Sequence, residues 1–359
     1  MKIAVLGTGS WGTALVKVLL DNGQEVAFWG RDPQQIESIG QTKHNAKYLK
    51  GVELIGKLTV TADLLQAVAG AEIIVLAVAS QAVRSLLTQI DANQISDDTI
   101  FVNVSKGIEL GTHKRISEIV LSFFPGNKYV VLSGPSHAEE VSAGIPTTLV
   151  SSSTSRAAAE RVQDVFSSGL LRVYTNPDVI GVELGGALKN IIALGAGISD
   201  GLGFGDNSKA ALMTRGIAEI ARLGRSLGAS SATFQGLSGI GDLIVTCTSL
   251  HSRNRRFGML IGQGVSVEKA LEEINMVVEG YYTIHSAYEL SLIENVEMPI
   301  TRELYRILYE GEDARDSVKR LMLRGKKHEL EEAAEALKIW DEPSLQNGKT
   351  LQSCSLLLQ

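Results

Sequence analysis

The sequence predicts an α/β protein in which a doubly wound sheet of parallel strands is followed by an all-helical C-terminal domain. Up to about residue 175, short runs rich in Val, Ile and Leu alternate with segments of helical pattern, which is typical of parallel strands joined by covering helices. After Asn176-Pro177 the β-branched runs nearly stop. Apolar residues then recur along one helical stripe, for example at Leu212, Ile220, Leu223 and Leu227.

The elements of the sheet domain are predicted in chain order. The run Ile3 to Leu6 predicts the first strand. The segment Trp11 to Asp21 predicts a helix that ends at Asn22-Gly23, where glycine can adopt the left-handed conformation. Glu25 to Trp29 predicts the second strand. Further strands, with helical patterns between most of them, are predicted at Leu58–Thr61, Glu72–Val78, Thr99–Val104, Tyr129–Leu132, Thr147–Ser151 and Leu171–Tyr174.

The chain of 359 residues is long enough for two domains of about 100 to 200 residues each. We predict a sheet domain over residues 1–177, a helical domain over 178–340 and a weakly ordered tail over 341–359. The first boundary is a change of composition rather than a flexible linker, so we expect a helix to leave the sheet directly. A cleft between the two domains is then the expected ligand site.

Composition narrows the function classes. Apolar residues make up 44% of the chain and charged residues 21%, with a net charge of −6, so no overall field attracts nucleic acid or an anionic membrane. Cys247 and Cys354 show no spacing for a disulfide framework or a metal site, which favours a reducing compartment. The apolar run Ile73 to Ala79 is far below the roughly 20 residues of a membrane span, and no secretory pattern follows Met1. We expect a cytoplasmic protein.

A glycine motif predicts a Rossmann-type dinucleotide site. Gly7-Thr8-Gly9-Ser10-Trp11-Gly12 is a GxGxxG segment directly after a predicted strand and directly before a predicted helix. Such glycines allow a sharp turn, close approach of a pyrophosphate and packing of helix on strand, while free amides at the helix start face the phosphates. The alternative is a glycine-rich turn that binds nothing.

The end of the second strand bears on the choice of cofactor. The stretch Phe28-Trp29-Gly30-Arg31-Asp32 lacks an acid where the strand ends, at the place where a carboxylate typically holds the ribose 2′-hydroxyl of NAD. Arg31 is placed to pair with a 2′-phosphate, which favours NADP. Asp32 leaves NAD open, and Arg31 could instead be a solvated turn residue.

Two lysines are candidates for chemistry. Lys106 follows the predicted strand Thr99–Val104, so it lies at the carboxyl edge of the sheet where open α/β folds bind ligands. Lys189 lies in a small and apolar helical segment, Gly185 to Leu194, where desolvation would lower its pKa toward a value useful for an acid or base. The alternative for each is a surface or snorkelling lysine.

A second cluster suits a phosphate. Asp242 stands between glycines and aliphatic residues, and Ser252-Arg253-Asn254-Arg255-Arg256 concentrates cations in a mildly acidic chain. The planar fork of an Arg matches phosphate oxygens, and Asn can orient a neighbouring hydroxyl. The alternatives are a solvated helix face for the Arg run and a helix cap for Asp242.

Taken together, these segments resemble the NAD(P)-dependent sn-glycerol-3-phosphate dehydrogenase family over residues 1 to about 325. The glycine motif alone is generic, but the ordered set is specific. The resemblance rests on Gly7-Thr8-Gly9-Ser10-Trp11-Gly12, Lys106-Gly107-Ile108-Glu109, Ser133-Gly134-Pro135-Ser136, Leu188-Lys189-Asn190, Asp200-Gly201-Leu202-Gly203-Phe204-Gly205-Asp206-Asn207, Gly239-Ile240-Gly241-Asp242, Ser252-Arg253-Asn254-Arg255-Arg256-Phe257-Gly258 and Val278-Glu279-Gly280.

The resemblance implies reversible reduction of dihydroxyacetone phosphate to sn-glycerol 3-phosphate with NADPH or NADH, for phospholipid synthesis, with Lys189 as general acid and base, no metal and a homodimer. Substrate contacts are implied at Lys106, Gly134, Ser136, Lys189, Asp242, Ser252, Arg253 and Asn254. Cofactor contacts are implied at Gly7, Gly9, Ser10, Trp11, Gly12, Arg31, Lys106, Ala138, Arg253, Val277 and Glu279. One departure is His137, where relatives usually carry Phe, and the resemblance does not cover the tail.

Two other functions stay open at this point. A two-domain dehydrogenase of a hydroxy acid or sugar phosphate would share the glycines but need not have the Ser-Arg-Asn cluster. A nucleotide-sensing regulatory protein would bind the cofactor without chemistry, which leaves the apolar setting of Lys189 without a reason. A hydrolase is not favoured, because the chain has neither GxSxG nor HExxH. Cys247 and His251 are interpreted as packing or rim residues, since no third orienting group is evident.

Overall fold

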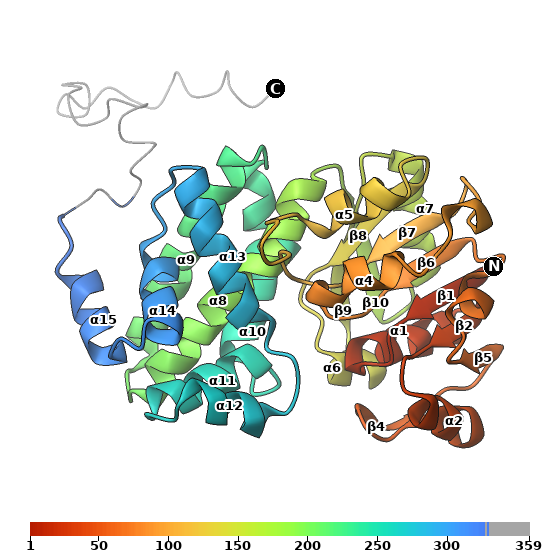
Figure 1. Cartoon of the computed structure of the whole chain (residues 1–359), viewed down its shortest axis with the longest axis horizontal. Helices are drawn as coiled ribbons and strands as arrows, with labels where there is room; N and C mark the ends of the chain where they lie inside the picture. Colours follow the sequence, from red (N-terminus) through yellow and green to blue (C-terminus); the bar gives the residue numbers. More distant parts are fainter. Residues whose placement is uncertain (327–328, 330–359) are drawn as a thin grey trace, which may run out of the picture. The chain divides into compact units, whose positions relative to one another are not determined.

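The computed structural model describes residues 1–326 and 329 of the chain. They belong to a compact unit, Met1–Val318, and to a second unit, Lys319–Gln359. The sheet, most of the helices and the candidate site lie in the first unit, whose elements Figure 1 colours in chain order. The predicted tail, 341–359, and the end of the predicted helical domain lie outside the described residues.

Eight strands form one sheet in the order β10-β9-β8-β7-β6-β1-β2-β5. β1 pairs with β2 on one side and with β6 on the other, so the chain builds the sheet in both directions from β1. The carboxyl ends of β1 and β6 are therefore the place where an open α/β sheet binds ligands. All the predicted strands are confirmed. Their bounds are β1 (Lys2–Leu6), β2 (Glu25–Trp29), β5 (Leu58–Thr61), β6 (Ile73–Leu76), β7 (Ile100–Asn103), β8 (Lys128–Ser133), β9 (Thr147–Ser152) and β10 (Leu171–Asn176).

Alternate side chains of β1 enter two different cores. Ile3 and Val5 belong to the core that contains Leu15 of helix α1, whereas Ala4 and Leu6 belong to the core on the opposite face. Successive side chains of a strand point to opposite faces, so a strand apolar at every position needs helices on both sides. The predicted first helix is confirmed as α1. The covering helices are α1 (Ser10–Asp21), α2 (Pro33–Thr42), α3 (Leu64–Val68), α4 (Val83–Leu87), α5 (Ile116–Phe123) and α7 (Arg156–Phe166).

The prediction of a wholly parallel sheet is wrong at β9. β9 pairs antiparallel with β8, and β10 pairs parallel with β9. The helix between β8 and β9, α6 (Ala138–Ser142), has five residues. At about 1.5 Å of rise per residue it is too short to carry the chain back along a strand that rises about 3.3 Å per residue. The chain therefore enters β9 at the edge where it leaves β8.

A small hairpin, β3 (His44–Asn45) with β4 (Leu49–Glu53), was not predicted. Most side chains of β4 are exposed or partly exposed, so its sequence lacks the apolar run that marks the strands of the main sheet. The hairpin follows α2 and lies beside α1, near the glycine-rich turn.

A long helix follows the last strand directly. β10 ends at Asn176 and α8 (Val179–Gly201) begins three residues later, with the Asp178 carboxylate accepting a hydrogen bond from the Gly181 amide at 2.8 Å. Among the described residues α8 alone is long and apolar enough to cross a membrane, but 89% of its most apolar stretch is buried inside the protein. It is the core helix of the helical domain.

Helices around α8 complete this domain (Figure 1). One of them, α11, approaches α8 closely through a glycine: a Cβ at Gly258 of α11 would lie 2.1 Å from the Leu194 carbonyl oxygen of α8. The close crossing brings the start of α11 alongside the segment of α8 that carries Lys189. The helices are α9 (Asp206–Ser226), α10 (Asp242–Thr248), α11 (Arg253–Gly262), α12 (Val267–Ile274), α13 (Glu279–Ile293) and α14 (Pro299–Tyr309). The last described helix, α15 (Ala314–Met322), includes the boundary between the two units.

Candidate active site

The glycine-rich turn has the geometry of a phosphate cradle. Gly7 has φ +125°, and a Cβ there would lie 2.5 Å from the carbonyl oxygen of Ala77, which follows β6. A Cβ at Gly12 would lie 2.1 Å from the Gly7 carbonyl oxygen. A Cβ at Gly9 would meet nothing within 4 Å, so backbone is open to a ligand there. The turn thus lies between the ends of β1 and β6 and fits a pyrophosphate.

The side chains beside this turn differ in how they are engaged. Ser10 donates a hydrogen bond to the Tyr48 carbonyl at 2.7 Å. Trp11 is partly buried, and its indole nitrogen has no hydrogen-bond partner. Arg31 is exposed, whereas the Asp32 carboxylate caps α2 by accepting from the backbone amides of the next turn. Asp32 is therefore occupied by the helix, and Arg31 faces solvent.

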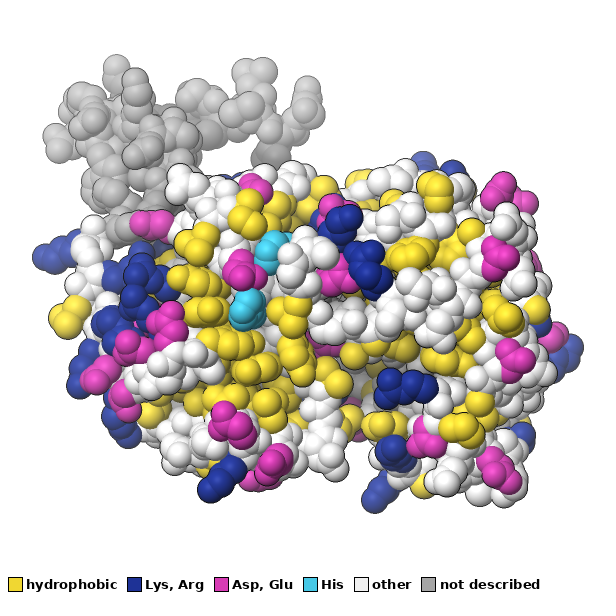
Figure 2. Space-filling model, viewed as in Figure 1, with side chains coloured by type: hydrophobic (Ala, Val, Ile, Leu, Met, Phe, Trp, Pro, Cys, Tyr) yellow, Lys and Arg dark blue, Asp and Glu magenta, His cyan; other side chains and the backbone are white. Residues whose placement is uncertain are grey.

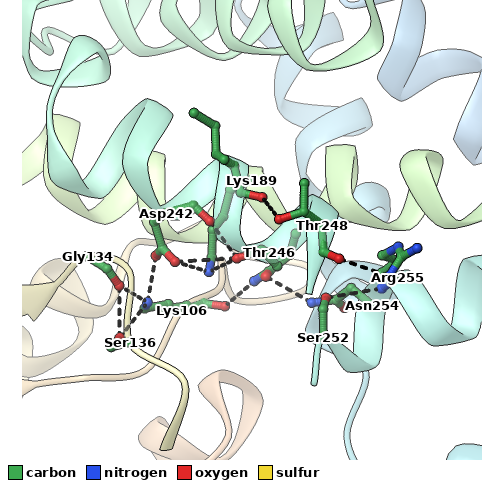
Figure 3. A network of polar contacts seen from close by, with 12 residues as sticks. Lys106, Gly134, Ser136, Lys189, Asp242, Thr246, Thr248, Ser252, Asn254 and Arg255 are labelled. Carbon is green, nitrogen blue, oxygen red and sulfur yellow. Dashed lines mark hydrogen bonds and ion pairs between the residues drawn. The ribbon is translucent and has the colours of Figure 1, made fainter. Parts of the chain in front are cut away.

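The two predicted lysines meet on one carboxylate (Figure 3). Lys106 Nζ lies 2.6 Å from Asp242 Oδ2, and Lys189 Nζ lies 2.5 Å from Asp242 Oδ1. Lys106 comes from the loop after β7, Lys189 from the middle of α8 and Asp242 from the first residue of α10. We call these three residues the lysine–aspartate centre. Asp242 does not cap its helix, because its side chain accepts no bond from the helix amides.

The charges of the lysine–aspartate centre depend on one another. Burial lowers the pKa of Lys189 to about 8, with Asp242 opposing this change and Lys106 adding to it. Burial alone would raise the pKa of Asp242, but the two ammonium groups hold it below its ordinary value. An ammonium with a pKa of about 8 can both give and take a proton near neutral pH. The arrangement therefore suits general acid and base catalysis.

The loop after β8 closes one side of this centre. Lys106 Nζ donates to the Gly134 carbonyl at 3.0 Å and lies 3.5 Å from Ser136 Oγ. Gly134 has φ +129°, a conformation that favours glycine. Lys106 thus holds the Gly134–Ser136 turn and Asp242 together.

The predicted phosphate cluster divides into different roles. Ser252 is the N-cap of α11 and accepts from the Arg255 amide at 3.2 Å. Asn254 donates to Asn190 Oδ1 at 2.9 Å, and Asn190 in turn donates to the Lys106 carbonyl at 3.2 Å. Asn254 is therefore connected to the lysine–aspartate centre. Arg255 is bound elsewhere, to Asp200 and to the Thr248 carbonyl, and Arg256 is exposed.

The remaining predicted residues lie around the start of α13 and of α6. Arg253 donates to the carbonyl of Val277, whose own side chain is exposed, at 2.7 Å. Burial lowers the pKa of Arg253, and Glu279 opposes the change. Glu279 is the first residue of α13 and accepts two bonds from Ser80. Ala138 is buried at the first position of α6.

Two family descriptions match most of the chain. The N-terminal domain of NAD-dependent glycerol-3-phosphate dehydrogenase matches residues 2–159, and the C-terminal domain of the same enzyme matches residues 178–319. The chain belongs to the NAD-dependent glycerol-3-phosphate dehydrogenase family. The resemblance stated from its motifs is confirmed.

Relatives within this family are similar over nearly their whole length. A protein of Thermoanaerobacter sp. named glycerol-3-phosphate dehydrogenase (NAD(P)+) is 56% identical over 331 residues, 92% of this chain and 99% of the relative. A protein of Bacillus subtilis with the same name is 53% identical over 334 residues, 92% of this chain and 96% of the relative. The crystal structure of glycerol-3-phosphate dehydrogenase from Coxiella burnetii superposes with a TM-score of 0.87 at 37% identity, over 90% of this chain and 99% of that one.

For three residues near the candidate site of this glycerol-3-phosphate dehydrogenase family member no role was predicted, although Asn190 stands in the motif Leu188-Lys189-Asn190. Thr246 Oγ1 lies 2.6 Å from Lys189 Nζ, Asn190 links Lys106 to Asn254, and Ser80 binds Glu279. Thr246 follows Asp242 at helical i, i+4 spacing, and Ser80 follows β6 much as Lys106 follows β7. The helical spacing of Thr246 from Asp242 and the place of Ser80 after a strand were the sequence signals that could have indicated these two residues. Among residues 1–326 and 329, no group of three or more His, Cys, Asp or Glu side chains is placed to hold a metal ion.

Two further side chains, those of His137 and Cys247, lie near Lys189 of the lysine–aspartate centre. The ring of His137 lies 5.7 Å from the ring of His251, centroid to centroid. Burial, and then the charge of Lys189, lower the pKa of His137, so this imidazole is neutral at pH 7. Cys247 is buried, and burial raises its pKa to about 12, so it stays a thiol.

Proposed function

We propose that this enzyme reversibly reduces dihydroxyacetone phosphate to sn-glycerol 3-phosphate with NAD(P)H and so supplies the glycerophosphate backbone of phospholipids. The observation that carries the proposal is the lysine–aspartate centre, a buried amine with a pKa of about 8 fixed 2.5 Å from a carboxylate. It occurs in a chain that is 56% identical to a relative named for this reaction. Fold likeness alone would not identify the substrate.

In the reductive direction Lys189 acts as the general acid. When NAD(P)H is bound, it supplies the hydride that adds to the carbonyl carbon. The Lys189 ammonium gives its proton to the oxygen, where the alkoxide develops, and the neutral amine then regains a proton from solvent. In the oxidative direction the neutral amine removes the hydroxyl proton. Asp242 holds the amine in place and keeps its pKa from falling further.

The substrate is held by the groups around this centre. Lys106, Gly134 and Ser136 of the sheet domain and Asp242 of the helical domain surround the reacting oxygen. Arg253 and Asn254 bind the phosphate at the start of α11, where the positive end of the helix dipole favours an anion. Ser252 supports them by capping the same helix. The substrate therefore contacts both domains, through Lys106, Gly134 and Ser136 of residues 1–177 and through Asp242, Arg253 and Asn254 of the helical domain.

The turn from Gly7 to Gly12 would hold the pyrophosphate of the cofactor, for which Gly9 leaves room. Ser10, Trp11, Ala138, Val277 and Glu279 line it. NADP is favoured over NAD, because Arg31 is exposed while Asp32 is occupied as a helix cap.

The proposal extends to setting and assembly. The enzyme acts on a small molecule as a cytoplasmic homodimer. The net charge of −6 supports a small-molecule substrate rather than nucleic acid, and the buried, free Cys247 supports a reducing compartment such as the cytoplasm. The family resemblance supports the dimer. On the face shown in Figure 2, basic side chains lie interspersed with acidic ones rather than in a continuous basic stripe. Light scattering of the purified protein tests the dimer.

Initial rates test the reaction itself. Oxidation of NADPH and of NADH is followed with dihydroxyacetone phosphate and, separately, with 2-keto acids. The proposal expects turnover with dihydroxyacetone phosphate and a lower KM for NADPH than for NADH. Turnover of 2-keto acids alone would assign the enzyme to hydroxy acids instead, and cofactor binding without oxidation in any of these mixtures would contradict an enzymatic role.

A further inference from the structure

A hydrogen-bonded pair outside the lysine–aspartate centre joins the sheet domain to the helical domain. Ser80 begins the short 3-10 turn η1 (Ser80–Ala82) after β6, and Glu279 begins α13. The Ser80 amide donates to Glu279 Oε1 at 3.0 Å, and the Ser80 hydroxyl donates to Glu279 Oε2 at 2.5 Å, across 199 residues of sequence. Both oxygens of one carboxylate are thus bound by a single residue of the other domain.

The segment at Gly107, which packs against this pair, leaves space for it because glycine has no side chain. A Cβ at Gly107 would lie 2.3 Å from Ser80 Oγ and 3.0 Å from Glu279 Oε2. Gly107 directly follows Lys106, so the pair packs against the segment that carries a lysine of the site. Ser80 is 1% exposed, so its hydroxyl is shielded from bulk solvent. Loss of that hydroxyl would therefore leave a carboxylate oxygen short of a donor.

We propose that Ser80 is a positioning residue for the reaction: it orients Glu279 against the bound dinucleotide and so sets the affinity for the cofactor. The inference rests on the proposed function, in which Glu279 lines the cofactor. Ser80 follows the carboxyl end of β6, the strand next to β1, where the strand order of the sheet reverses. This is the edge of the sheet at which such folds bind a dinucleotide. Ser80 acts through Glu279 and need not touch the cofactor.

The charge of Glu279 depends on Ser80. Burial raises the pKa of Glu279, while the hydroxyl and amide of Ser80 and the charge of Arg253 oppose this change. Glu139 acts on Arg253, whereas the amine of Lys106, one residue from Gly107, is bound to Asp242. Without the Ser80 hydroxyl, Glu279 takes up its proton at a higher pH. The cofactor contact is then lost earlier as the pH falls.

The test is a double-mutant cycle with Ser80→Ala and Glu279→Gln in the full-length enzyme. Ser80→Ala is expected to raise the KM for NADPH about tenfold to a hundredfold, as for loss of a hydrogen bond to a buried charged group, with kcat nearly unchanged. The rise of this KM on acidification should begin at a higher pH than in the wild type. In the Glu279→Gln background, Ser80→Ala should have no further effect. Ser85→Ala, which removes an exposed hydroxyl of α4, is the matched control and should match the wild type.

Several results would overturn the inference. One is a wild-type KM and pH profile in Ser80→Ala, and another is an equal effect of Ser80→Ala with and without Glu279→Gln. A lower melting temperature with an unmoved pH profile would show a merely structural role. If Glu279→Gln binds NADPH like the wild type while dihydroxyacetone phosphate is still reduced, the inference fails and the proposed function stands. If the wild type reduces no substrate, the proposed function fails, and fluorescence titration with NADPH still decides the role of Ser80.

Discussion

Two buried polar clusters lie six residues apart on α8 and differ in how their charges are balanced. In the first, which we call the Glu183 cluster, the carboxylate of Glu183 accepts from Arg115, from the amide and hydroxyl of Ser117 and from the hydroxyl of Tyr129, at 2.5 to 3.0 Å. The one cation, Arg115, faces the buried Glu183 and also pairs with the exposed Glu118 at 3.3 Å. In the lysine–aspartate centre two cations share one anion.

The difference separates anchoring from chemistry. In the Glu183 cluster the buried anion has a cation partner and accepts four hydrogen bonds, so the cluster holds the start of α8 against the sheet. The lysine–aspartate centre carries one excess positive charge, and burial makes that excess costly enough to bring the pKa of Lys189 to about 8. A buried excess charge of this kind favours an anionic substrate and an oxygen that becomes negative during the reaction.

Removing the amine gives the largest expected effect. Lys189→Ala should lower kcat for dihydroxyacetone phosphate by about 10²- to 10⁴-fold, the typical contribution of general acid and base catalysis. The Kd for NADPH, measured by fluorescence titration, should stay nearly the same, because Lys189 lies on the substrate side. Lys17→Ala removes a partly exposed lysine that is paired with Asp21 and serves as the control. Near-wild-type turnover in Lys189→Ala would show that the lysine–aspartate centre, like the Glu183 cluster, takes no part in the chemistry.

The opposite behaviour is expected of the anchoring cluster. Glu183→Gln should lower the free energy of unfolding by about 1–3 kcal/mol, because it weakens several hydrogen bonds to a buried charged group. The kcat of the folded enzyme should change little. Urea denaturation measures the stability, with the exposed Glu160→Gln as control. A large loss of kcat without loss of stability would mean that Glu183 takes part in the reaction.

A charge outside both clusters should have the smallest effect. Arg31→Ala should raise the KM for NADPH only about threefold to fivefold, since exposed ion pairs contribute about 0–1 kcal/mol. The KM for NADH should not change. Kinetics with both cofactors check this, and an equal change for the two would show that Arg31 does not read the 2′-phosphate.

The strands of the sheet could be predicted because each is a short β-branched run bounded by glycine or polar residues, and that pattern is local. The direction of β9 could not be predicted in this way. It depends on how far α6 carries the chain, and a five-residue helix leaves little trace in hydrophobic periodicity. The β3–β4 hairpin was not predicted either, because its strands are mostly exposed or partly exposed and so lack an apolar run.

The sequence offered candidate site residues one by one but not their arrangement. Lys106 was indicated by its place after a strand, and Lys189 by its apolar helix. That both meet on Asp242, 136 and 53 residues away along the chain, follows only from the packing of α8 and α10 against the sheet domain. Asp242 alone would equally have suited a helix cap, and only the fold decides between the two.

The pH dependence of kcat tests the lysine–aspartate centre most directly. With Lys189 as the proposed general acid, reduction of dihydroxyacetone phosphate uses its ammonium, so kcat should fall as the pH rises through about 8, and the rate of the reverse reaction should rise over the same range. In Asp242→Asn the carboxylate that raises the pKa of Lys189 is gone, and the fall should move to lower pH. A kcat that does not change across this range, or a fall at the same pH in Asp242→Asn, would contradict the account.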